Sequence, residues 1–110
     1  MISRELMGFI EAQQKRLLKA FPKFEALDKK SQILAKTVKL SEEVGELSQA
    51  VLALLEIQRK EKLEHKDAMA NLSEEVADVI ITTLSLAHEC GVPVEEALAA
   101  KIEKLCERFK

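Results

Sequence analysis

The sequence predicts an all-α fold, a compact bundle of about four helices in a single domain over residues 1–110. The composition is typical of a helical protein, with 47% hydrophobic and 33% charged residues but few aromatic residues (4%), glycines (3) and prolines (2). Apolar residues also recur at three- and four-residue spacings, the period of an amphipathic helix. At 110 residues the chain is long enough for one modest core and short for two domains.

The first helix is predicted from Ser3, which can cap its N-terminus, to about Ala20. Pro22 ends it, and residues 22–30 are expected to form a short connection. The predicted apolar side of this helix consists of Leu6, Phe9, Ile10, Leu17 and Phe21.

A second helix is predicted to begin after a cap at Asp28 or Ser31 and to run to about Lys60. Apolar periodicity fades over residues 59–70, which favours a solvated loop or a frayed helix end there. The predicted apolar stripe of the second helix consists of Ile33, Leu40, Val44, Leu47, Val51, Leu54 and Leu55.

Asn71 with Glu74 resembles a capping box and predicts the start of a third helix, which ends at Gly91. Pro93 suits the first turn of a fourth helix that runs to the C-terminus. Its predicted inward residues are Ala97, Leu98, Ile102, Leu105 and Phe109.

The second helix carries an unusual group of acidic residues at Glu42, Glu43 and Glu46. Glu43 and Glu46 lie one helical turn apart at the border of the apolar stripe, and like charges at such spacings destabilise a helix. Gly45 between them costs roughly 1 kcal/mol relative to alanine in a helix interior. A cation held between the carboxylates would explain the acids, and a glycine would admit a ligand or second helix.

The third helix repeats the arrangement with Glu75 and Asp78, again three residues apart. Asp78 is the only charged residue between positions 76 and 87, so this helix is expected to be largely buried. A carboxylate in such surroundings must be neutralised, paired or bound to a metal. Two facing carboxylate pairs would form an all-oxygen site suited to Mg²⁺ or Mn²⁺.

Plainer interpretations of these residues stay open. Glu42 and Glu43 are also compatible with an ordinary solvated helix face, and Asp78 with a buried ion pair to Lys36 or Lys39. A ferritin-like di-iron site needs Glu-x-x-His on two helices. Ser85 stands three residues before His88 and Lys62 three before His65, so neither histidine fits that pattern.

The sequence Glu42-Glu43-x-x-Glu46, followed by Glu75-x-x-Asp78, resembles the EExxE…ExxD signature of the MazG-type all-α nucleoside triphosphate pyrophosphohydrolases. The resemblance covers roughly residues 30–109. It implies a Mg²⁺-dependent enzyme that cleaves a nucleoside triphosphate between the α- and β-phosphates, releasing the monophosphate and pyrophosphate. Mn²⁺ is a possible substitute.

The resemblance also implies roles for individual residues. Glu43, Glu46, Glu75 and Asp78 take the places of the family's metal ligands, and Glu42 joins Glu43 and Glu46 in the catalytic group as the residue that holds a further ion or orients the attacking water. The positions that bind phosphate in the family match Lys101, Lys104 and Arg108. The family often has asparagine where this chain has Ile102, which weakens the match of this last helix.

Two alternatives to this function remain. One is a related pyrophosphohydrolase that acts on phosphoribosyl-ATP or dUTP, and the other is a non-catalytic metal-binding helical interaction module. The resemblance further implies a homodimer, or a homotetramer built as a dimer of dimers. The abundance of leucine, isoleucine and valine, more than one small core requires, agrees with self-association.

The net charge and the cysteines limit which partners and which cellular compartment are expected. The net charge of −2 gives no basic surface for nucleic acid, and no run of 18 apolar residues predicts a membrane span. Cys90 and Cys106 lack metal-ligand spacing and are expected to be reduced, small packing residues. Because no signal peptide is evident, we expect a cytoplasmic protein.

Overall fold

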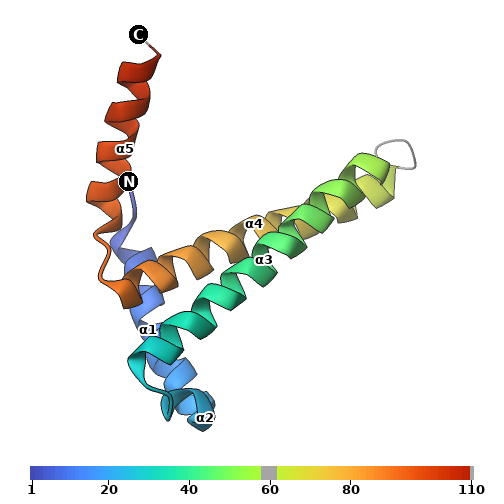
Figure 1. Ribbon diagram of the computed structural model, residues 1–110. Coiled ribbons are helices and arrows are strands. Elements are labelled where there is room, and N and C mark those ends of the chain that lie inside the picture. Colours follow the sequence, from blue (N-terminus) through green and yellow to red (C-terminus); the bar gives the residue numbers. More distant parts are fainter. Residues whose placement is uncertain (58–61, 110) are drawn as a thin grey trace. The chain divides into compact units, whose positions relative to one another are not determined.

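The computed structural model describes residues 1–57 and 62–109, and every regular element in these ranges is a helix (Figure 1). The helices are α1 (Arg4–Ala20), α2 (Pro22–Glu25), α3 (Lys29–Ile57), α4 (Lys62–Cys90) and α5 (Val94–Arg108). The prediction of an all-α fold is therefore confirmed. The described ranges hold five helices instead of four because the connection after α1 contains one turn of helix. None of these helices has a stretch long and apolar enough to cross a membrane.

The chain groups into two compact units, which are described separately. One unit comprises residues 34–83, the larger parts of α3 and α4. The other comprises residues 1–33 and 84–110, with α1, α2, α5 and one end of each long helix. The single domain over residues 1–110 stays a prediction.

Helix α1 begins and ends where its boundary signals predict. The Ser3 hydroxyl accepts a hydrogen bond from the Leu6 amide at 3.0 Å, which satisfies one of the free donors of the first turn. At the other end the Phe21 amide donates to the Leu17 carbonyl, and Pro22 opens α2. Only Ile10 of the predicted apolar side is fully buried.

Asp28, and not Ser31, caps α3. Its carboxylate accepts a hydrogen bond from the Ser31 amide at 2.7 Å, and this bond holds the pKa of Asp28 below its usual value. The side-chain amide of Gln32 donates to the carbonyls of Phe24 (3.2 Å) and Leu27 (3.1 Å), which ties the connection to the first turns of α3. No local sequence pattern predicts these hydrogen bonds of Gln32.

Helix α4 begins nine residues before the predicted cap at Asn71. The expectation of a loop or frayed end is therefore wrong for residues 62–70, which are helical, while residues 58–61 lie outside the described ranges. The charged residues there are good helix formers, and Ala68 is buried. The end of α4 is as predicted, because Gly91 adopts the left-handed conformation with φ of 73°.

Within the unit of residues 34–83, α3 and α4 lie side by side and antiparallel (Figure 1). Buried and half-buried positions follow one stripe on each helix at alternating spacings of three and four residues. We call these two stripes the seam. The α3 part of the seam consists of Lys36, Leu40, Glu43, Leu47, Ala50 and Leu54, and the α4 part of His65, Ala68, Leu72, Glu75, Val79 and Thr82.

Several residues predicted to face inward are exposed instead. They are Val44, Val51 and Leu55 of α3, Val76 and Ile80 of α4, and all five predicted inward residues of α5. Asp78, expected to be buried, is exposed as well. For α3 and α4 the physical reason for this exposure is that a helix packed against a single neighbour buries only one stripe of its surface. Cys90 and Cys106 are unpaired and also exposed, so the packing role predicted for them is wrong.

Candidate metal centre

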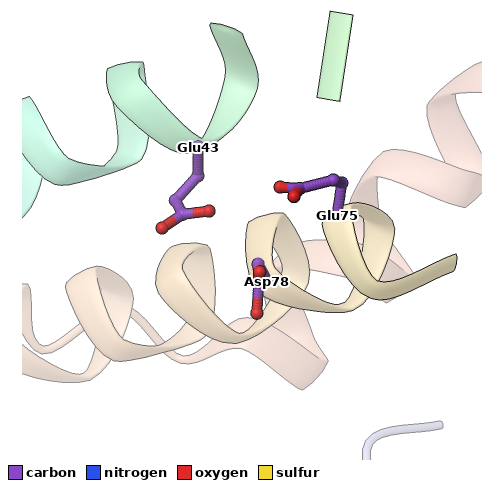
Figure 2. Close-up of side chains that lie close together, drawn as sticks. All are labelled: Glu43, Glu75 and Asp78. Carbon is purple, nitrogen blue, oxygen red and sulfur yellow. The ribbon is translucent and has the colours of Figure 1, made fainter. Parts of the chain in front are cut away.

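Three carboxylates meet near the middle of the seam, where Glu43 of α3 faces Glu75 and Asp78 of α4. One oxygen of each lies within 4.8 Å of the others. Glu75 and Asp78 come from consecutive turns of α4 because their three-residue spacing is close to one helical turn. Figure 2 shows the carboxylates of Glu43 and Glu75 extending toward one another across the space between the helices, with Asp78 on the next turn.

The carboxylate of Glu43 is held in an unfavourable position. Glu43 is only 7% exposed, and its Oε2 atom is buried without a hydrogen-bond partner. The Oε2 atom of Glu75 is likewise buried and without a partner. A charged oxygen that is buried without a hydrogen-bond partner is destabilising unless a proton or a cation neutralises it. These two oxygens therefore suit the binding of a cation between α3 and α4.

Electrostatics around Glu75 support the same conclusion. Burial raises the pKa of Glu75 first, and the negative charges of Glu46, Asp78 and Glu43 raise it further. Because its negative charge acts on the Glu75 carboxyl, Glu46 lies beside the cluster although it is exposed to solvent. Four carboxylates in total thus act on one small volume.

One lysine lies directly against this group. The Nζ atom of Lys39 is 3.2 Å from Oε1 of Glu43 and 3.7 Å from Oε2 of Glu42. The hydrogen bond and the charge of Glu43 raise the pKa of the Lys39 ammonium. Sequence reasoning considered Lys39 only as a partner for Asp78. Its four-residue spacing to Glu43 was the signal that could have placed it correctly.

The structure thus brings Glu43, Glu75 and Asp78 together, with Glu46 beside them. Glu42 lies outside this group, exposed and paired with Lys39. His65 is half-buried in the seam and His88 is exposed near the end of α4. The three basic residues predicted to bind phosphate are exposed on α5, which belongs to the other unit, and their role stays a prediction; they are Lys101, Lys104 and Arg108.

The donor set fits a small hard cation. All of its ligand atoms are carboxylate oxygens, which Mg²⁺ and Mn²⁺ prefer over softer metals. The two buried oxygens without partners supply an observation independent of the acidic residue count. In the described part of the chain, Glu43, Glu75 and Asp78 could therefore hold a metal ion.

Comparison with known proteins agrees with this geometry. The model of the MazG-like family matches residues 38–110, about two thirds of the chain, including all five acidic residues of the motif. Among curated proteins and among solved structures, none matches the chain significantly.

Proposed function

Because the chain belongs to the MazG-like family, we propose that it is a Mg²⁺-dependent nucleoside triphosphate pyrophosphohydrolase. In this reaction water attacks the α-phosphorus, and the bond between the α- and β-phosphates breaks. The products are a nucleoside or deoxynucleoside monophosphate and pyrophosphate. The observation that carries the proposal is the cluster of Glu43, Glu75 and Asp78 with its two buried, unpartnered oxygens.

The chain's own residues would act mainly by positioning. Glu43, Glu75 and Asp78 would hold the cation, and Glu46 would complete the ligand set beside Glu75. A bound Mg²⁺ supplies charge neutralisation at the phosphates and lowers the pKa of a coordinated water. The antiparallel pair of α3 and α4 is suited to this task because both carboxylate pairs are on helices, which fix their separation better than loops do.

Two further roles follow from the resemblance and belong to the same proposal. Glu42 is exposed at the edge of the cluster, where its carboxylate can accept a proton from the attacking water or hold a second ion. Lys101, Lys104 and Arg108 would bind the phosphates, since their spacing of three and then four residues places them on one face of α5.

Self-association is part of the proposed function as well. On the side of α3 opposite the seam, exposed residues recur at alternating spacings of three and four residues. We call this row the outer stripe of α3. It consists of Leu34, Val38, Ser41, Gly45, Ser48, Leu52 and Leu55. Its large apolar members are exposed, Leu52 by 63%. Small residues at its centre would allow another helix to approach closely. A second copy of the chain is the occupant we propose, in a homodimer or a dimer of dimers.

The proposed reaction is tested by pyrophosphate release from a panel of canonical and modified nucleoside triphosphates, with Mg²⁺ and with EDTA. Glu46→Gln removes a proposed ligand without changing the side chain's shape. Glu56→Gln is its matched control, because Glu56 is an exposed residue of the same helix. We expect metal-dependent release with the monophosphate as co-product, lost in Glu46→Gln and kept in Glu56→Gln.

Other outcomes of this experiment would identify the alternatives. Release from dUTP alone, or from phosphoribosyl-ATP alone, would assign the narrower substrate. Metal binding that stabilises the fold, without turnover of any substrate, would contradict the enzymatic proposal and support a metal-binding interaction module.

A further inference from the structure

The two oxygens of the Glu43 carboxylate have different surroundings. Oε1 accepts a hydrogen bond from Lys39 at 3.2 Å, whereas Oε2 is buried and has no partner. The same ammonium also reaches Glu42 at 3.7 Å. The Lys39 ammonium therefore neutralises the outer edge of the acidic cluster, next to the position proposed for a divalent cation.

Helix stability alone does not account for Lys39. A lysine four residues before a glutamate has the less favourable order of the two for a helical ion pair. The Lys39 side chain is 57% exposed, so the pair is weak and its ammonium can leave at little cost. Lysine is a flexible point charge, which suits a residue that changes partners.

We propose that Lys39 is an exchangeable counter-ion: it neutralises Glu42 and Glu43 before a divalent cation binds, and then moves to the phosphate oxygens of the substrate. This inference rests on the proposed function. With a divalent cation held by Glu43, Lys39 would no longer be needed to balance this carboxylate, and its ammonium would be repelled by the ion. The phosphates of a bound nucleotide would then offer the released ammonium an anionic partner.

The proposal predicts effects of opposite sign on the two ligands, which a merely structural role would not produce. The test compares wild type with Lys39→Met in two titrations. The first measures Mn²⁺ affinity without nucleotide, and the second measures how the Mn²⁺-loaded protein binds a triphosphate analogue with a non-hydrolysable α,β-bridge. We expect Lys39→Met to bind Mn²⁺ roughly three- to tenfold more tightly. We expect it to bind the analogue about five- to tenfold more weakly.

Two further variants serve as controls. Lys66→Met removes an exposed lysine of α4 that lies about 13 Å along the helix from Glu75, so both affinities should stay unchanged. Lys39→Arg keeps the charge and should retain much of the wild-type behaviour in both titrations. Far-ultraviolet circular dichroism establishes that each variant is folded.

Each other result has a definite meaning. Weaker Mn²⁺ binding by Lys39→Met would overturn the exchange and show that Lys39 only holds Glu43 in place. Unchanged analogue binding would overturn the contact with phosphate. A wild-type protein that binds neither Mn²⁺ nor the analogue would instead refute the proposed function, which separates the two failures.

Discussion

The two faces of α3 follow the same three- and four-residue spacing and have opposite surroundings. The seam includes a lysine and a glutamate among its buried residues, Lys36 and Glu43, each only 7% exposed. The outer stripe includes Leu52, a leucine that is 63% exposed. The seam thus buries two charged residues while the outer stripe exposes a large leucine, a combination that burial of apolar surface alone would not select. The buried Glu43 belongs to the acidic cluster that could hold a metal ion, and the exposed leucines and valines of the outer stripe form the surface proposed for a second copy.

The largest expected effect comes from removing the charge at the centre of the seam. Glu43→Gln should weaken Mn²⁺ binding at least about a hundredfold, because even the supporting residues of metal sites contribute 10- to 100-fold. Isothermal titration calorimetry measures this directly.

The matched control for this charge is again Glu56→Gln, since Glu56 is exposed on the same helix and lies outside the cluster. Its Mn²⁺ affinity should equal that of wild type. Equal losses in the two variants would mean that the ion binds to the general negative charge of α3 and has no site in the seam.

The second prediction compares one leucine from each face. Leu47→Ala should lower the free energy of unfolding by about 2 kcal/mol, because Leu47 packs in the seam. Leu52→Ala should change it by less than about 0.5 kcal/mol in the monomer, since that side chain is mostly in water already. Urea denaturation at concentrations where the chain is monomeric gives both values. Equal costs would show that the outer stripe is covered within one copy.

Much of the fold could be predicted from the sequence because local signals determine it. Ser3, Pro22 and Gly91 act within one helical turn of themselves, and the boundaries they predicted are observed. The start of α4 could not be predicted in the same way, because residues 62–70 are mostly charged and apolar periodicity, the signal of an amphipathic helix, fades there. Charged residues with good helix propensity can continue a helix in this stretch, because only a few positions such as Ala68 have to be buried in the seam.

The candidate site was predictable only in part. The spacing of Glu75 and Asp78 on one helix is a local property, and their meeting with Glu43 followed from pairing the two acidic helices. Which residues are buried could not be read in the same way, since burial depends on the neighbour that a face meets. Asp78 was therefore expected to be buried and is exposed, whereas Glu43 is buried.

A third prediction concerns pH and the charge within the seam. Since the pKa of Glu75 is raised in the folded protein, the native state holds this proton more tightly than the unfolded chain does. The contribution of Glu75 to the stability of the metal-free protein should therefore fall as the pH rises from about 4.5 through the raised pKa. Thermal unfolding across this range should show a flatter profile for Glu75→Gln. A contribution from Glu75 that rises with pH would contradict the assignment.

The smallest expected effect lies on the outer stripe. Apart from Gly45, its two chain neighbours and the nearby backbone of α3, no heavy atom of the described residues lies within 4 Å of the position that a Cβ at Gly45 would occupy. Gly45→Ala should therefore raise the free energy of unfolding of the monomer by roughly 0.5–1 kcal/mol through better helix propensity. In the proposed dimer the added methyl group would lie where the second copy's helix packs, so the dissociation constant should increase.

Gly8→Ala separates these two effects. Gly8 is also a helical glycine with open space around it, so alanine there should stabilise α1 by a similar amount and leave association unchanged. Sedimentation equilibrium and urea denaturation on both variants measure the two quantities independently. If Gly45→Ala stabilises the monomer and associates as wild type does, the second copy packs elsewhere, and the exposed leucines and valines of α3 need another partner.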